Sequence, residues 1–252
     1  MKVSKKFISF ICGISLTAGF LAGVSIKNEA LQTSLVCQPI LKRTGYTTWY
    51  DARNRIPYLV YEKLTPQSLT PSVSRKDAFS IDPDIFELHR STLEDYARSG
   101  FDRGHLGAAA NHRSSEKALN ETFLLSNICP QNPQCNRGVW SKIESYVRSL
   151  VSSAQSVDVY TGPLFLPEEG PDGKRRVSYQ VIGPHDVAVP THLFKLVHVH
   201  LKDGKEFKEA FLVPNRSLRP SQEIKSFSVS VTEIEKLSGI VFPWNLASQL
   251  LK

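Results

Sequence analysis

Residues 101–150 hold the side chains best suited to chemistry, and the stretch begins with Asp-Arg-Gly-His at 102–105. Histidine has an ordinary pKa of about 6.5, so His105 can accept a proton near neutral pH. Arg103 offers a planar set of donors that suits a phosphate group. Gly104 allows close approach of a bulky ligand to the backbone. These residues indicate phosphate chemistry, although a histidine beside an arginine also occurs on ordinary surfaces.

A helix is predicted from about residue 136 to about residue 152. Apolar residues recur in it at helical spacing and indicate one face packed on a core: Val139, Trp140, Ile143, Val147, Leu150 and Val151. A neighbouring stripe, at intervals of four, holds Asn136, Trp140, Glu144 and Arg148. Taken singly, Asn136 could be an N-cap, and Glu144 with Arg148 a surface ion pair. Their combination with His105 is what points to a functional site.

Hydrolysis of a phosphodiester needs an activated water, charge relief in the transition state and help for the leaving oxygen. His105 can take the proton from water as a general base. Asn136 offers a side-chain oxygen of the kind that Mg²⁺ binds, and Glu144 can accept hydrogen bonds from waters on the metal. Arg103 and Arg148 can hold phosphate oxygens by charge-assisted hydrogen bonds.

These segments resemble the DNA/RNA non-specific endonucleases of the ββα-metal (His-Me finger) superfamily, and most closely the endonuclease G branch. The matching text is 102–105 (DRGH), 111–113 (NHR), 122–127 (TFLLSN), 130–131 (PQ), then Asn136, Trp140, Glu144 and Arg148. Weaker similarity at 50–53, 58–64, 189–195 and 238–242 extends the resemblance over about residues 45–247.

The resemblance implies a sugar-non-specific endonuclease that cleaves DNA and RNA to 5′-phosphate ends. It implies contact with the phosphate backbone, without base readout. It implies His105 as general base, Asn136 as metal ligand, and Mg²⁺ as cofactor with Mn²⁺ as the alternative. The other catalytic-site residues that it implies are Arg103, Glu144, Arg148 and Asn127, of which Arg103 and Arg148 would also bind substrate. Members of the family often form homodimers.

Two other functions are consistent with the same residues. One is a nucleic-acid-binding protein whose catalysis has decayed. The other is a metal-dependent phosphodiesterase that acts on small substrates. No nucleotide-binding fingerprint is present, so a nucleotide cofactor is not indicated.

The predicted fold is α+β, with a central, mostly antiparallel sheet flanked by helices and a ββα-metal nuclease motif. Strands are expected at 47–50, 58–64, 121–128, 157–160, 177–182, 194–201 and 210–213. Residues 129–135 hold two prolines and are expected to form a loop, and 168–176 a charged hairpin loop. Ser230 and Glu233 form a capping box that opens a short helix closed by Gly239.

The nuclease domain is expected at residues 44–252, after a linker at 31–43. Residues 1–30 read as a signal peptide or an N-terminal membrane anchor, because lysines precede an apolar stretch at 7–26 that could associate with a membrane. We therefore expect an exported protein: periplasmic, secreted or membrane-anchored. A mitochondrial location is the alternative, although residues 1–30 contain no arginine.

The 252-residue chain carries a formal net charge of +7, part of it in residues 1–30, and a basic body suits a polyanionic partner. Cys129 and Cys135 enclose five residues beside Asn136; a disulfide and two ordinary thiols are both consistent with this spacing. His198 and His200 alternate along one predicted strand, a spacing that can bind zinc. With no third ligand evident, a structural role is expected for both.

Overall fold

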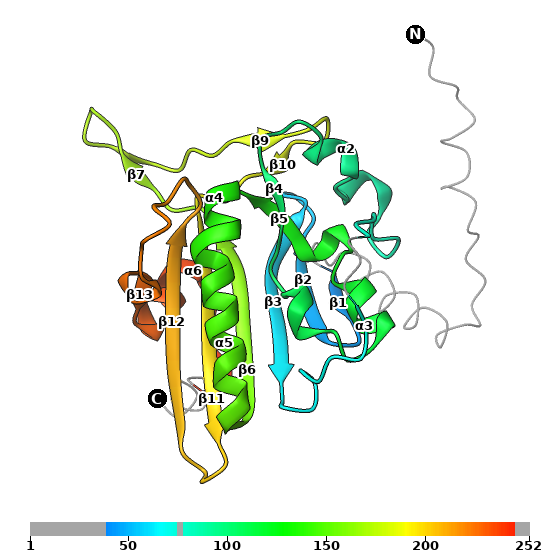
Figure 1. Ribbon diagram of the computed structural model, residues 1–252. Helices are drawn as coiled ribbons and strands as arrows, with labels where there is room; N and C mark the ends of the chain where they lie inside the picture. The colour runs from blue at the N-terminus through cyan, green and yellow to red at the C-terminus, as the bar shows by residue number, and fades with distance from the viewer. Residues whose placement is uncertain (1–38, 75–77, 245–252) are drawn as a thin grey trace, which may run out of the picture. The chain divides into compact units, whose positions relative to one another are not determined.

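The computed structural model describes residues 39–74 and 78–244. The targeting segment predicted at 1–30, with its membrane association through 7–26, lies outside these residues. Within them, one antiparallel sheet has seven strands, which confirms the predicted α+β class (Figure 1). Its spatial order is β1 (Ile40–Lys42), β2 (Tyr46–Asp51), β3 (Ile56–Leu64), β6 (Ala154–Leu164), β11 (His192–Leu201), β12 (Glu206–Pro214) and β13 (Ser228–Val229). The first strand of the sheet, β1, thus lies within residues 31–43, which were expected to form a linker.

In the described residues, three two-stranded sheets lie outside this one: β4 (Asp102–His105) with β5 (Ile128–Gln131), β7 (Glu168–Glu169) with β8 (Arg175–Arg176), and β9 (Val181–Ile182) with β10 (Val187–Ala188). The α-helices of the described residues are α2 (Leu93–Tyr96), α3 (Glu116–Glu121), α4 (Pro133–Cys135), α5 (Ser141–Ser153) and α6 (Val231–Ser238). Short 3₁₀ turns are η1 (Glu87–His89), η2 (Ala109–Asn111), η3 (Leu125–Asn127) and η5 (Ile224–Phe227), and η4 (Asn136–Trp140) is a π turn.

Strand β11 divides the core between two helices. Successive side chains of a strand point to opposite faces of the sheet. Leu193, Val197 and Val199 therefore pack in the larger core cluster with α5, which buries Ile143, Val147 and Val151 at intervals of four. The alternate side chains Phe194 and Leu196 pack with Ile234 of α6 in a second cluster. Figure 1 shows α5 and α6 on opposite sides of the sheet.

The predicted helix start at Ser230 is confirmed as an N-cap of α6. Ser230 Oγ accepts a hydrogen bond of 3.1 Å from the backbone N–H of Glu233. The helix ends at Gly239, whose φ of 71° lies in the left-handed region that glycine adopts without strain.

Two predicted elements are wrong. Residues 121–128 form the end of α3 and the 3₁₀ turn η3 rather than a strand, and only Ile128 belongs to β5. Residues 129–135 are the rest of β5 and the short α4 rather than a loop. Pro130 is tolerated in β5 because this strand pairs on one side only, so no neighbour needs the missing N–H. Of 177–182, only Val181–Ile182 is a strand.

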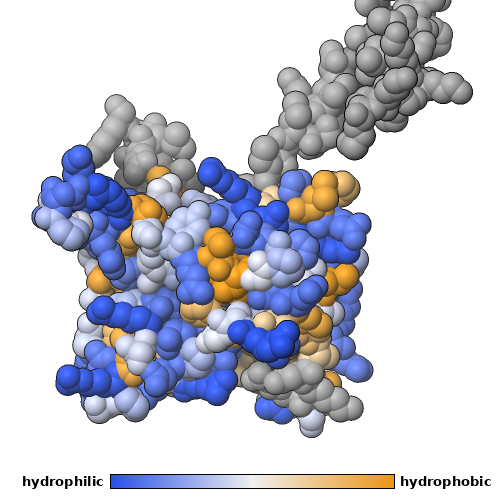
Figure 2. Space-filling model, turned by 90° about the horizontal axis from the view of Figure 1, so that it is seen from above, coloured by the Kyte–Doolittle hydropathy of each residue, from blue (hydrophilic) through white to orange (hydrophobic). Residues whose placement is uncertain are grey.

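The face seen from above in Figure 2 is predominantly hydrophilic, and its apolar residues lie in separate patches. None of the helices within residues 39–74 and 78–244 combines the length and the hydropathy that a membrane span requires.

Candidate active site

A β–β–α unit carries most of the predicted site residues. β4 pairs antiparallel with β5, with His105 opposite Ile128, and the chain continues through α4 and η4 into α5. Gly104 faces Gln131 on the paired strand, and a Cβ at this position would collide with that side chain. The small size of Gly104 therefore serves the packing of β4 on β5, and the close approach of a ligand stays a prediction.

The unit opens onto a pocket of about 460 Å³. Four predicted residues line it together, namely Arg103, His105, Asn136 and Glu144. The other residues of its lining are Phe79, Asp102, Ala109, Ala110, Arg137 and Ser141. Two arginines, two carboxylates, an amide and an imidazole thus meet in one pocket, a set suited to the hydrolysis of a phosphodiester.

Two aromatic rings hold the imidazole of His105 at the pocket. Its ring centroid lies 5.1 Å from that of Phe123, edge to face, and 5.3 Å from that of Phe79. The guanidinium carbon of Arg103 lies 4.4 Å above the ring of Phe79. Phe79 therefore positions both the expected base, His105, and the expected phosphate-binding residue, Arg103, a role that the sequence did not indicate.

Asp102 orients the predicted metal ligand. Asn136 Nδ2 donates a hydrogen bond of 2.9 Å to Asp102 Oδ2, so the amide oxygen of Asn136 is the atom left for a cation. Arg137 also donates to this carboxylate, at 2.8 and 2.6 Å. Burial raises the pKa of Asp102, but hydrogen bonds from Arg137 and Asn136 outweigh it and hold the pKa below its ordinary value. The side-chain partners of Asp102 are thus Asn136 and Arg137.

A π turn sets the direction of Asn136. The turn Asn136–Trp140 has non-helical dihedral angles at Gly138, φ −101° and ψ −109°. Asn132, not Asn136, provides the N-cap of α4, because its Oδ1 accepts from the N–H groups of Gln134 and Cys135. Trp140 is 1% exposed and lies in the core, so the predicted stripe of four is interrupted at this position.

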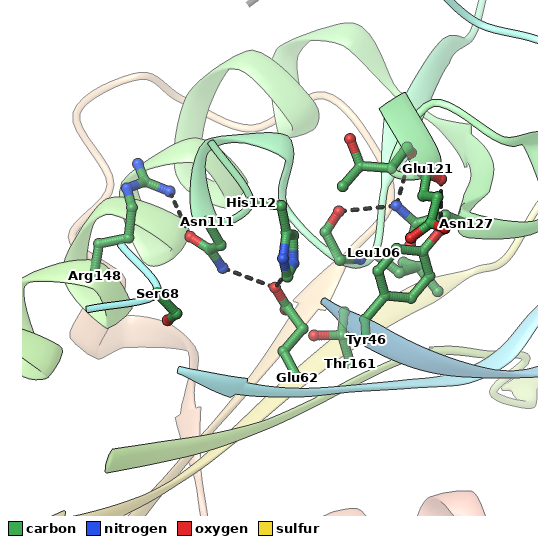
Figure 3. Close-up of polar contacts among 12 residues, drawn as sticks. Tyr46, Glu62, Ser68, Leu106, Asn111, His112, Glu121, Asn127, Arg148 and Thr161 are labelled. Carbon is green, nitrogen blue, oxygen red and sulfur yellow. Dashed lines mark hydrogen bonds and ion pairs between the residues drawn. The ribbon is translucent and has the colours of Figure 1, made fainter. Parts of the chain in front are cut away.

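Arg148 lies on α5 one turn beyond Glu144 and is absent from the pocket lining. Its Nη1 donates to Asn111 Oδ1 at 3.4 Å, and Asn111 Nδ2 donates to Glu62 Oε1 at 2.9 Å (Figure 3). His112 Nε2 lies 2.9 Å from the same oxygen. A chain of hydrogen bonds therefore runs from the guanidinium of Arg148 to a carboxylate that is wholly buried in the sheet.

Lys195 completes this polar layer. It is 1% exposed, and its Nζ donates 2.6 Å to Thr161 Oγ1 and lies 5.0 Å from the ring centre of Trp140. Burial lowers the pKa of Lys195, while Glu62 and Glu144 act in the opposite direction. Burial raises the pKa of Glu62, but hydrogen bonds from His112 and Asn111 and the charge of Lys195 leave the pKa below its ordinary value. A buried carboxylate is thus kept ionised by its neighbours.

This layer predicts a specific dependence of stability on pH. Because the pKa of Glu62 in the folded protein lies below its ordinary value of 4.5, the stabilisation exists above that value and is lost as pH falls through the folded pKa. Urea unfolding between pH 6 and pH 3 should therefore give a steeper loss of unfolding free energy for wild type than for Glu62→Gln. Equal slopes would contradict the assignment.

Asn127 is buried beneath the site rather than in it. Its Oδ1 accepts from the N–H of Gly107 at 2.8 Å, and its Nδ2 donates to the carbonyls of Gly107 and Thr122 at 2.9 Å each (Figure 3). The side chain is 0% exposed and does not line the pocket. Asn127 therefore fixes the backbone of Gly107, two residues after His105, and its role is to position that segment.

Cys129 and Cys135 are free, buried thiols. Burial raises the pKa of each to about 12. Since the thiolate is the reactive form, neither should react with iodoacetamide at pH 8 in the native protein, and both should react in urea. Mass spectrometry of the proteolytic peptides measures the labelling of Cys129 and Cys135 separately from that of Cys12 and Cys37. Equal labelling of Cys129 in the two conditions would contradict its burial.

The fold and the pocket define a ββα nuclease, and the comparisons with known proteins agree. The model of the family described as DNA/RNA non-specific endonuclease matches residues 26–249. The chain belongs to this family.

Its relatives are nucleases. The chain is 43% identical to human "Endonuclease G, mitochondrial" over 208 residues, which are 82% of this chain and 70% of the relative. It is 41% identical to "Nuclease C1" of Cunninghamella echinulata var. echinulata, over 80% of this chain and 81% of that one. With human "Nuclease EXOG, mitochondrial" it shares 40% identity over 79% of this chain but only 55% of the relative. A solved structure of an EndoG/EndoGI complex matches with a TM-score of 0.78 and 40% identity, over 81% and 84% of the two chains.

Proposed function

We propose that the protein is a metal-dependent endonuclease that hydrolyses the phosphodiester bonds of DNA and RNA, leaving 5′-phosphate ends. The observation that carries the proposal is the pocket that brings His105, Asn136, Glu144 and Arg103 together. Family membership supports the class of reaction, and the residue roles rest on the geometry of this chain.

His105 acts as the general base in this proposal. The rings of Phe79 and Phe123 restrict its imidazole, so a water in the pocket meets a fixed proton acceptor. Arg103 binds phosphate oxygens from the stacked position over Phe79. Arg148, tied to Asn111, contributes positive charge from the next turn of α5.

The donor set fits a divalent cation that prefers oxygen ligands. Asn136 would hold it through the amide oxygen, since the amide nitrogen is engaged by Asp102, and Glu144 would accept hydrogen bonds from its waters. When bound, the cation would stabilise charge on the phosphate and on the leaving oxygen. Mg²⁺ fits these neutral and carboxylate oxygens best, with Mn²⁺ as the alternative.

The substrate is proposed to bind through its phosphates. The net charge of +7 and the hydrophilic face in Figure 2 favour a polyanion over an apolar ligand. Affinity for DNA should therefore fall as salt rises, because phosphate contacts release counterions.

Cleavage of a closed circular plasmid tests the proposal. Wild type should nick the plasmid in Mg²⁺ and leave it intact in EDTA, and single-stranded RNA should be degraded under the same conditions. A protein that binds the plasmid but never cuts it would be the decayed binding protein. Activity on small phosphodiesters alone would favour the small-substrate phosphodiesterase.

Location and assembly remain proposals. The names of the human relatives include "mitochondrial", which favours the mitochondrial alternative over export, although both depend on residues 1–30 outside the described ranges. Fusion of residues 1–43 to a fluorescent protein would decide between them. The homodimer that the family implies can be tested by light scattering of the purified chain.

A further inference from the structure

His198 and His200 lie close to two carboxylates on the face of the sheet that α6 covers. Their side chains share one face of β11 because they are two residues apart. β6 places Asp158 opposite His198, and β12 places Glu206 opposite His200. The expectation that no third ligand accompanies the two histidines is therefore wrong. The third candidate ligand is Asp158, which lies forty residues before His198 in the chain but on the neighbouring strand β6.

The four side chains form one linked cluster, and three of them could share an ion. His200 Nε2 lies 2.8 Å from Asp158 Oδ2, and His198 Nε2 lies 2.9 Å from Glu206 Oε2. His200 Nδ1 lies 3.8 Å from the same oxygen of Glu206, and the two imidazole centroids are 4.1 Å apart. One ligand atom from each of Asp158, His198 and His200 lies within 4.8 Å of the other two.

These separations suit one shared ion. Zinc binds imidazole nitrogen and carboxylate oxygen at about 2.0–2.2 Å in tetrahedral geometry, so two ligands on one ion stand roughly 3.4 Å apart. The hydrogen-bonded pairs, at 2.8 and 2.9 Å, are closer than that value, and the three ligand atoms of Asp158, His198 and His200 all lie within 4.8 Å of one another. Small rotations of the side chains would therefore replace the present hydrogen bonds by bonds to a metal.

The surroundings orient the carboxylates toward the histidines. Tyr61 Oη donates 2.7 Å to Asp158 Oδ1, which leaves Oδ2 for His200, and Lys208 Nζ bonds Glu206 Oε1 at 3.0 Å, which leaves Oε2. Outer partners of this kind fix the ligands of metal sites.

We propose that His198, His200 and Asp158 bind a transition-metal ion of the zinc type, with Glu206 as the fourth ligand. The site is separate from the pocket of the proposed nuclease, which lies on the side of α5 and shares none of these residues. A metal here joins β6, β11 and β12 at one end of the sheet, so it should stabilise the fold. Imidazole nitrogens favour zinc over the magnesium expected in the pocket.

Zinc titration of the full chain tests the proposal. The parent carries Asn136→Ala, so that a metal held in the pocket does not contribute, and it is freed of metal with a chelator. Competition with a chromophoric chelator at pH 7.5 should show one zinc that His200→Gln or Asp158→Asn in the same parent loses or binds at least a hundredfold more weakly. The matched control is His89→Gln, an exposed histidine on η1, which should bind like the parent.

Melting temperatures give a second readout. Zinc at a hundredfold excess over its Kd should raise the melting temperature of the parent by several degrees and leave that of His200→Gln unchanged. Melting without metal shows whether each variant folds. Equal zinc affinity in parent and variants, or no zinc bound at micromolar concentration, would overturn the proposal. Because neither readout uses nuclease activity, failure of the proposed function would not affect the result.

Discussion

His105→Ala is expected to lower the rate of plasmid cleavage by about 10²–10⁴-fold, the range that a positioned general base contributes. Among the described residues that line the pocket, His105 carries the only imidazole, and Glu144 is the residue expected to serve metal-bound water. The loss should appear in the cleavage rate at saturating plasmid. DNA affinity, measured by fluorescence polarisation in EDTA, should stay within a few-fold of wild type, because Arg103 and Arg148 are intact.

Two further variants make this result interpretable. His105→Gln keeps much of the volume between Phe79 and Phe123, so its fold should be retained while catalysis is still lost. His89→Ala removes an exposed histidine outside the pocket and should cleave like wild type. Cleavage by His105→Ala within threefold of wild type would remove His105 from the role of base.

Asn136→Ala is expected to raise the Mg²⁺ concentration for half-maximal cleavage by more than about tenfold. Loss of an outer partner of a metal ligand costs about 10–100-fold in metal affinity, and loss of the ligand itself should cost at least as much. Asp102→Ala, which frees the amide of Asn136 to rotate, should give a smaller shift in the same direction. The measurement is the initial rate of cleavage over a series of Mg²⁺ concentrations.

The matched control is Asn120→Ala, an exposed asparagine on α3 outside the pocket lining. It should show the wild-type dependence on Mg²⁺. An Asn136→Ala variant with the same dependence as this control would mean that another residue holds the cation.

The sequence predicted the parts of the site whose residues lie close together in the chain. His105, Asn136 and Glu144 belong to one β–β–α unit, and residue type together with the family resemblance grouped them. The direction of Asn136 was not predictable, because the π turn breaks the interval of four on which the stripe of side chains was based. Trp140, a member of that stripe, is consequently in the core.

The buried layer beneath the site was missed for another reason. Glu62, Asn111 and Lys195 are far apart in sequence, and no local period joins them. A signal was present in one strand, since Lys195 is the one charged residue in the run 193–197. Glu62 stands beside Lys63, and this pair looks like the solvent end of a strand. Such residues are rarely buried without partners, and the sheet topology supplies the partners.

The false strand at 121–128 shows the limit of apolar runs as evidence. Phe123 and Leu125 are buried, as the run suggested, but the backbone that carries them forms turns rather than a strand. The side chain of Asn127 satisfies backbone groups of Gly107 and Thr122 there, which is the task that strand pairing would otherwise perform. A short apolar run without alternation does not distinguish these two solutions.

At the π turn Asn136–Trp140, a change that stabilises the helix is expected to impair the proposed cleavage activity. A π turn contains one residue more than a regular α-turn, and it is a rare conformation that is found mainly at functional sites. Deleting one residue, such as Gly138, would let α4 and α5 join as one uninterrupted α-helix, while Asn136 would rotate by about 100° relative to Glu144. Selection for a more stable fold alone would favour that deletion, so a deletion variant that melts higher but no longer cleaves would show that the extra residue serves the proposed site.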